Sequence, residues 1–202
     1  MKYLKTLIVL FFTILIWSLI NPKEYFTWFL EVFPALIGII VLFFTFKKFR
    51  FTNFVYTLIF IHCCILIIGG HYTYAEVPLF DWIKEVFHQS RNNYDKVGHF
   101  AQGFVPAFII REIFIRKNII NNKKWLSFIV VSVCMAISVT YEFIEWFVSV
   151  MVGGESADAF LGTQGYIWDT QSDILFATIG AIIGLAVLGK FHNVQINLFL
   201  QK

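Results

Sequence analysis

Long apolar runs alternate with short polar segments along the whole chain. Runs of about 18 or more apolar residues are typical of membrane-spanning helices. Runs close to or above this length cover residues 4–20, 26–46, 52–70, 98–115, 126–151 and 174–190. Because they leave little room for a soluble domain, the pattern predicts one all-α integral membrane domain over residues 1–202, with six transmembrane helices.

The charges between the runs predict the topology. The 202 residues are 58% hydrophobic and only 14% charged, with a net charge of +3. Basic residues gather at both termini and in the segments "KKFR" and "RKNIINNKK", which all lie on one side of a six-span arrangement. The positive-inside rule places that side in the cytoplasm. The basic residues therefore indicate topology, and we expect a membrane lipid as partner and no nucleic acid.

Acidic residues show the opposite distribution. Glu112 is the one acid expected toward the cytoplasmic side, where we also expect Arg111 and Glu112 to anchor the membrane interface. The other acids fall in the outer loops or in the outer parts of the runs. Acids contribute little to topology, so this asymmetry points to a site on the outer, non-cytoplasmic face.

Two outer segments interrupt the apolar pattern. The third run ends in "GGHYTYAEVP", where the paired glycines and Pro78 predict the end of the helix. Residues 79–89 follow, with Phe80, Ile83 and Phe87 at roughly helical spacing and charges between them, which predicts a short interfacial helix on the outer surface. Residues 152–172 are rich in glycine and polar side chains and predict a long loop.

The fourth run begins with polar residues on one face. Asp95, His99 and Gln102 are spaced at i, i+4 and i+7, as expected for neighbours on a helix. A charge near the middle of a membrane helix costs about 2.5–3.5 kcal/mol, which makes such residues candidates for a functional site. The alternative is that Asp95 or a preceding asparagine caps the helix while Lys96 stays in headgroup water.

The fifth run carries two glutamates in "YEFIEW". They form part of a polar stripe along one face, made of Ser138, Glu142, Glu145 and Ser149. Two carboxylates this close cannot both be ionised in a low dielectric without a cation or a shared proton. The alternative is a structural ion pair with Lys96 or Arg91.

Two further groups complete the candidate set. Asp169 and Asp173 are spaced at i and i+4 where the last run begins, although "TQSD" also matches a capping box with Thr170 at the cap. His71, at the end of the third run, is a further candidate; the first three runs are otherwise almost featureless. Packing of the last three helices, helped by small residues in "ATIGAIIGLAVLG", would join these groups in one pocket.

The same residues carry a family resemblance. "NNYDKVGHFAQGFVPA", "YEFIEW" and "QGYIWDTQSDILFATIGAIIG" closely resemble the YjdF family of bacterial inner-membrane proteins, whose function is unknown. The second half is more distantly similar to the VanZ family, which is linked to teicoplanin resistance. That resemblance matches the positions Asp95, Lys96, His99, Phe100, Glu142 or Glu145, Asp173, Gly180 and Gly184. This chain departs from it by "ILFAT" after the last aspartate, a second glutamate and a longer loop.

Three functions fit these observations. The first is an enzyme acting on an envelope lipid or lipid-linked headgroup, in which Glu142, Glu145 and Asp173 hold a divalent metal and His99 is the general acid or base. The second is a scaffold or binding protein whose buried charges only orient helices. The third is a proton-coupled transporter, against which the absence of polar residues in the first three runs counts. The enzyme hypothesis further assigns Asp95 to catalysis, and Lys96, Gln102, His71 and Asp169 to binding.

Overall fold

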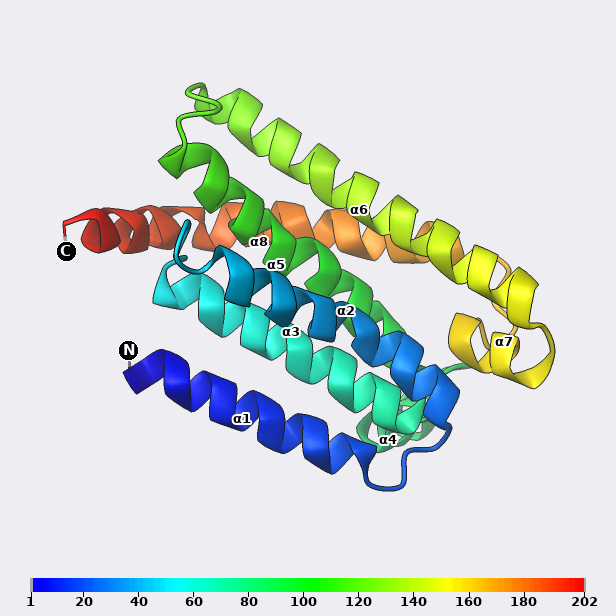
Figure 1. Cartoon of the computed structure of the whole chain (residues 1–202). Helices are drawn as coiled ribbons and strands as arrows, with labels where there is room; N and C mark the ends of the chain where they lie inside the picture. The colour runs from blue at the N-terminus through cyan, green and yellow to red at the C-terminus, as the bar shows by residue number, and fades with distance from the viewer. Residues whose placement is uncertain (1, 202) are drawn as a thin grey trace.

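Helices make up all the regular structure described for this chain (Figure 1). The computed structural model describes residues 2–201, apart from the side chains of residues 155, 156 and 158. In chain order the helices are α1 (Lys2–Leu19), α2 (Tyr25–Thr45), α3 (Asn53–Tyr72), α4 (Pro78–Val86), α5 (Tyr94–Arg116), α6 (Lys123–Val152), α7 (Gly154–Leu161) and α8 (Asp169–Leu200), with a 3-10 turn η1 (Tyr74–Glu76) before α4. The all-α prediction is confirmed.

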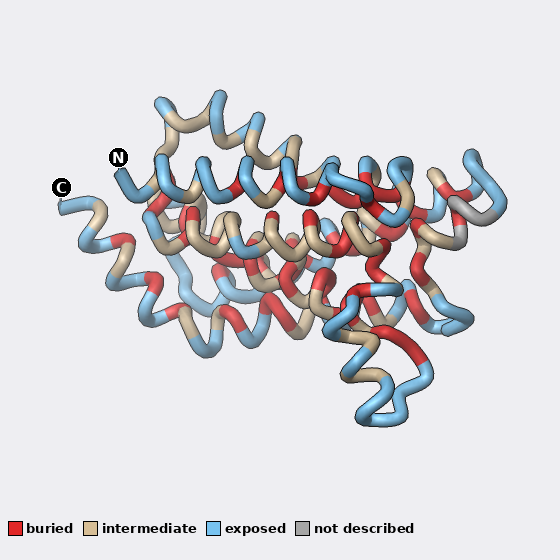
Figure 2. Tube along the Cα trace, turned by 90° about the horizontal axis from the view of Figure 1, so that it is seen from below, coloured by how far each residue is buried: buried red, intermediate tan, exposed pale blue. Residues whose placement is uncertain are grey.

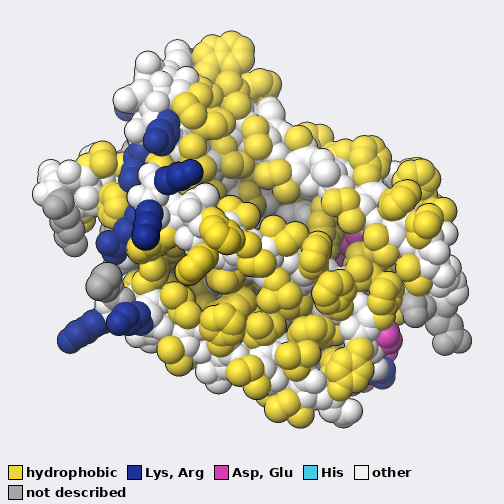
Figure 3. All heavy atoms as spheres, viewed as in Figure 1, with side chains coloured by type: hydrophobic (Ala, Val, Ile, Leu, Met, Phe, Trp, Pro, Cys, Tyr) yellow, Lys and Arg dark blue, Asp and Glu magenta, His cyan; other side chains and the backbone are white. Residues whose placement is uncertain are grey.

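Five helices are long and apolar enough to cross a membrane, namely α1, α2, α3, α6 and α8. They cover five of the six predicted runs. Hydrophobic side chains also dominate the face seen in Figure 3, over the length of the bundle. α5, over the predicted run 98–115, is long enough but not apolar enough to be among the five. The physical reason is its position, because α3, α6 and α8 pack against it and its side chains need not be apolar enough to face lipid.

The helices form two groups of three. α1 and α2 pack on α3, while α5, α6 and α8 pack on one another, and α3 against α5 joins the groups. Buried residues run through the interior of the bundle, and exposed ones lie on its outer faces (Figure 2). The largest groups of buried charged side chains lie at the two ends of α5.

α5 and α8 cross with their backbones in contact. A Cβ atom added to Gly103 would lie 1.7 Å from the carbonyl oxygen of Ala177, and one added to Gly180 would lie 2.1 Å from that of Phe100. Only glycine fits at either position. The crossing lies about one turn below His99 and so brings the first turn of α8 against the first turns of α5. It confirms the close packing predicted from the small residues of the last run.

The segments before and after the site differ from the predictions. α3 does not end at the paired glycines but continues to Tyr72. A Cβ atom on Gly69 would overlap the ring of Tyr74, and one on Gly70 would lie 3.2 Å from Cβ of Glu31, so the glycines make room for neighbours. The predicted loop 152–172 contains α7. The predicted interfacial helix corresponds to α4, which Pro78 begins rather than prevents.

Candidate functional site

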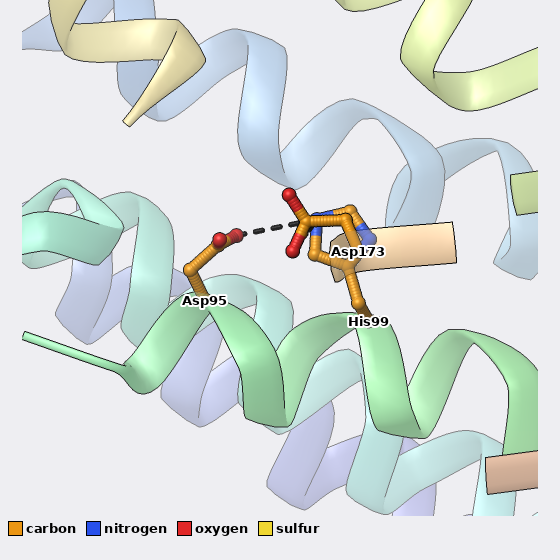
Figure 4. A group of neighbouring side chains, drawn as sticks. All are labelled: Asp95, His99 and Asp173. Carbon is orange, nitrogen blue, oxygen red and sulfur yellow. Dashed lines mark ion pairs between the residues drawn. The ribbon is translucent and has the colours of Figure 1, made fainter. Parts of the chain in front are cut away.

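The centre of the site is a group of three side chains between α5 and α8 (Figure 4). Asp95 and His99 rise from one face of α5, as their spacing predicts, and meet Asp173 from the first turns of α8. The Nε2 atom of His99 lies 3.2 Å from a carboxylate oxygen of Asp95 and 3.8 Å from one of Asp173. Among the described residues, these three are the group whose ligand atoms lie within 4.8 Å of one another, the geometry needed to hold a metal ion.

Two buried cations already occupy part of this group. Lys96 extends its ammonium to Asp173, to Asp169 at 2.7 Å and to Asp95 at 3.3 Å. Arg91 pairs with Asp169 and lies 3.4 Å from Asp95. Both cations are largely buried, and their ion pairs connect the start of α5 to the start of α8.

The capping interpretations are wrong for Lys96, Asp95 and Thr170, although a preceding asparagine, Asn93, does stand at the N-cap position of α5. Lys96 does not extend into headgroup water but is buried among three aspartates. Asp95 lies in the first turn of α5 rather than at its cap, and the backbone N–H of Tyr94 donates to Asn92 instead. α8 begins at Asp169, so Thr170 is not the cap of a capping box. The charges therefore make contacts between helices rather than at helix ends.

The glutamates of α6 face the other side of His99. Glu142 approaches its Nδ1 atom to 3.7 Å, and Gln102 lies 3.2 Å from the same nitrogen. The Oε1 atom of Glu142 is shielded from solvent yet has no hydrogen-bond partner, and Ser138 one turn earlier has an unpartnered hydroxyl. Glu145 is buried too. The alternative interpretation of these glutamates as partners of Lys96 or Arg91 is wrong, because both cations pair with aspartates.

Sequence reasoning missed one buried carboxylate. Glu31 of α2 is 5% exposed and lies where α2 packs against Gly70 of α3. It stands in an apolar helix with no polar residue at i+3 or i+4, so no periodic signal marks it. Its burial corrects the description of the first three runs as almost featureless, and it removes one argument against a proton-coupled carrier.

His71 does not belong to this group. Its Nδ1 atom lies 2.9 Å from the carbonyl oxygen of Ser18, and its ring packs on Trp17 with centroids 4.5 Å apart. His71 therefore connects α3 to the end of α1. The structure joins the other predicted residues in one region and leaves this one outside it.

A groove of about 750 Å³ opens beside the aspartates. Its polar lining includes Arg91 and Lys96 and no carboxylate, while Val97, Phe100 and Phe176 supply apolar walls. The Tyr166 ring lies within 6 Å of both cations. The remaining lining residues are neutral and polar: Gln89, Ser90, Asn93 and Ser172. The lining of the groove thus combines two cations with apolar and aromatic side chains.

The segment after α7 is hydrogen-bonded to the residues just before α5. The side-chain amide of Gln164 accepts from the backbone N–H of Asn92 at 2.9 Å and donates to its carbonyl at 2.8 Å. Arg91 donates to the carbonyl oxygen of Gly162 at 3.2 Å. These contacts hold the connection between α6 and α8 across the aspartate side of the site.

A second polar cluster surrounds Glu112 at the opposite end of α5. Thr52 donates to its carboxylate through both the backbone N–H (2.9 Å) and the hydroxyl (2.8 Å). Arg116 adds a bond of 2.7 Å and His192 one of 3.0 Å. Glu112 is completely buried, so the prediction that it anchors the membrane interface is wrong. Instead it joins α5, α8 and the start of α3.

Comparisons with known proteins place the chain in a family. Residues 3–194 match the family model described as predicted membrane protein DUF2238. The inner membrane protein YjdF of Escherichia coli strain K12 is 45% identical over 186 residues, which cover 92% of this chain and 88% of that protein. No solved structure gives a significant match. The chain therefore belongs to the DUF2238 family of multi-pass inner-membrane proteins, the family of YjdF.

Proposed function

We propose that this protein binds a membrane amphiphile with an anionic headgroup at the non-cytoplasmic face, and that the carboxylate and histidine site acts on that headgroup with a divalent cation. The observation that carries this proposal is the groove. Two buried cations and no carboxylate line it, and the aromatic side chains of Phe100 and Phe176 supply apolar walls. This combination fits an anionic headgroup attached to an acyl or polyprenyl chain.

The topology of the proposal has α5 as the sixth span and both termini in the cytoplasm. α5 has 23 residues, about 34 Å of helix, which is enough to cross the hydrocarbon core. Lys and Arg side chains gather at the end of the bundle that carries the termini (Figure 3). An even number of spans and the positive-inside rule then put the site at the outer leaflet, with α4 lying in the interface.

The chemistry follows from the two sides of His99. On one side the aspartates hold Lys96 and Arg91 toward the groove, where these cations can receive a phosphate or carboxylate headgroup. On the other side Glu142 and Glu145 supply hard oxygen ligands for a divalent cation. His99 stands between them and serves as general acid or base. Asp173, the third predicted metal ligand, forms an ion pair with Lys96 instead. The proposed cation therefore has a coordination position that Asp173 does not fill.

The groove is tested by lipid binding in nanodiscs of defined composition. Ser90 is exposed at the groove, so Ser90→Glu adds a negative charge without touching the buried ion pairs. We expect it to weaken retention of fluorescent phosphatidic acid relative to phosphatidylcholine, while the matched Ser90→Gln does not. Equal retention by both variants would exclude the groove as an anionic headgroup site.

The metal is tested by its content in the detergent-purified protein. We expect a near-stoichiometric divalent ion in the wild type, and its loss from Glu142→Gln and from His99→Ala. Folded protein without metal in all three samples would exclude the metal-assisted mechanism.

A structural scaffold is the second candidate, because the ion pairs of Lys96 and Arg91 join α5 to α8. Buried ion pairs can specify helix packing without any chemistry. Under this alternative, Ser90→Glu leaves lipid retention unchanged and the purified protein carries no metal.

A carrier is disfavoured by the middle of α5. Between its two polar clusters, the buried face of α5 consists of the apolar residues Ala101, Gly103, Val105, Ala107 and Phe108.

A further inference from the structure

We propose that the groove recognises a hydroxyl-bearing phosphodiester headgroup, as in a glycerol-phosphate or sugar-phosphate lipid, and that Gln89, Asn93 and Ser172 bind its hydroxyl groups. This inference rests on the proposed binding of an anionic amphiphile and names the class of its headgroup. The structural basis is the neutral polar part of the lining, which an anion bound to Arg91 and Lys96 leaves unused.

The neutral polar side chains come from two segments. Gln89, Ser90 and Asn93 lie between α4 and α5, and Ser172 lies in the first turn of α8. The Nδ2 atom of Asn93 donates to the Oε1 atom of Gln89 at 2.9 Å. Among the described residues, neither the Oδ1 atom of Asn93 nor the Nε2 atom of Gln89 has a hydrogen-bond partner. A free acceptor and a free donor therefore stand on neighbouring side chains of the lining.

The hydrogen-bonding capacity of these groups selects the ligand. Arg91 and Lys96 can only donate, so they complement the oxygens of a phosphodiester, which only accept. The Oδ1 atom of Asn93 needs a donor, which must come from another part of the headgroup. An ammonium group would be repelled, because the lining holds two cations and no carboxylate. A hydroxyl is neutral and both donates and accepts, so it complements the free atoms of Asn93 and Gln89.

The segment that carries this amide pair is held in place by Asn92. Asn92 is completely buried, and its side-chain amide donates to the carbonyl oxygen of Val77 at 3.1 Å and to Asp81 at 3.0 Å. Gln164 bonds to both backbone groups of the same residue. Asn93 follows directly along the chain, so the polar wall loses little conformational freedom when a ligand binds, which favours specific recognition.

The test compares lipids that share their acyl chains and differ in their headgroups. The full-length protein in detergent is mixed with equal amounts of the dioleoyl forms of phosphatidylglycerol, phosphatidylethanol, phosphatidylethanolamine and phosphatidylcholine, and bound lipids are counted by native mass spectrometry. Phosphatidylglycerol and phosphatidylethanol carry the same phosphodiester charge, but only phosphatidylglycerol has hydroxyl groups. We expect about tenfold more bound phosphatidylglycerol than phosphatidylethanol, the ratio that one or two hydrogen bonds supply.

Variants assign this preference to the lining. Gln89→Met removes the amide at a similar side-chain length, and we expect it to lower the ratio by about threefold or more. Ser172→Ala should lower the ratio in the same direction. Gln171→Met is the matched control, since Gln171 is exposed on α8 outside the groove lining, and its ratio should equal that of the wild type. A ratio unchanged in both Gln89→Met and Ser172→Ala overturns the role of these residues.

The wild-type ratios separate this inference from the proposed function and depend on no variant. Equal binding of phosphatidylglycerol and phosphatidylethanol, with both above phosphatidylcholine, overturns the recognition of hydroxyl groups and leaves the anionic groove in place. Equal binding of phosphatidylglycerol and phosphatidylethanolamine overturns it too, because the donor could then be an ammonium group. Binding of all these lipids at the level of phosphatidylcholine overturns both proposals.

A soluble competitor distinguishes a lipid from a free phosphodiester. Glycerophosphoglycerol, the deacylated headgroup, should not displace bound phosphatidylglycerol at an equal concentration, because it lacks the chains that contact Val97, Phe100 and Phe176. Displacement at that concentration overturns the assignment to a lipid.

Discussion

Two buried glutamates at opposite ends of the same bundle have contrasting surroundings. Glu112 accepts two hydrogen bonds on each carboxylate oxygen, from Thr52, Arg116 and His192. Glu142 has its Oε1 atom without a hydrogen-bond partner, and the nearest nitrogen of His99 lies 3.7 Å from that atom. Both are at least nine-tenths buried. A satisfied carboxylate needs nothing further and stabilises the fold, whereas an unsatisfied one is costly unless a ligand completes it.

The histidines next to these two glutamates, His192 and His99, also differ in how completely their ring nitrogens are partnered. Arg111 can only donate to Nδ1 of His192, at 3.1 Å, so that nitrogen is unprotonated and Nε2–H donates to Glu112. One tautomer is fixed. His99, by contrast, has carboxylate oxygens near both nitrogens, from Asp95 and from Glu142. His99 can bind a proton on either ring nitrogen, which suits acid–base chemistry better than a purely structural hydrogen bond does.

The largest expected loss of stability comes from removing the carboxylate of Glu112, whose oxygens are fully hydrogen-bonded. Glu112→Ala leaves Arg116 and the donors of Thr52 buried without a partner, so we expect a loss of about 3–5 kcal/mol in the free energy of unfolding. A thiol-reactive dye measures it, because Cys63 and Cys134 are buried until the chain unfolds. Glu85→Ala is the control, and an equal loss there would remove the distinction between these positions.

The next largest loss of stability is expected at the crossing of α5 and α8, which lies between the two polar clusters. Gly103→Ala places a methyl group against the backbone of α8, where no side chain can yield, so we expect a loss of about 2 kcal/mol or more. Gly38→Ala in α2 is the matched control, since nothing lies within 4 Å of its added Cβ. That variant should unfold no more readily than wild type, and a comparable loss in both would show that the crossing is not tightly packed.

Replacing Glu142 should not lower the free energy of unfolding, in contrast to replacing Glu112. Without added metal, Glu142→Gln removes a buried charge next to Glu145, so we expect unchanged stability or a gain of about 1 kcal/mol. Added Mn²⁺ should stabilise the wild type and not the variant. A large loss of stability in metal-free Glu142→Gln would mean that this glutamate is a structural group like Glu112.

The smallest effects concern the hydroxyl groups of the two clusters. Thr52→Val removes a donor to Glu112 and the cap of α3, and should cost about 1–2 kcal/mol. Ser138→Ala removes a hydroxyl that has no partner, so stability should change by less than about 0.5 kcal/mol. Thermal unfolding of both variants side by side gives the comparison, which fails if Ser138→Ala is the more destabilised.

The sequence predicted the long helices and the polar neighbours within each of them because both depend on local spacing. Apolar length marks a span, and spacings of three and four residues put Asp95 beside His99 and Glu142 beside Glu145 on their own helices. Small residues in the last run likewise indicated close packing, which the contact of Gly180 with the backbone of α5 realises.

Pairing between helices depends on which elements become neighbours, and local spacing carries no information about that. Lys96 would be an ordinary interfacial lysine if α8 did not place Asp169 and Asp173 beside it. Glu31 is a single acid in an apolar helix, and its burial beside Gly70 depends on the packing of α2 against α3. The chain by itself therefore determined the helices and the residue types of the polar clusters. The tertiary structure alone decided which carboxylates have a partner, because satisfaction of a buried charge is a property of contacts and not of spacing.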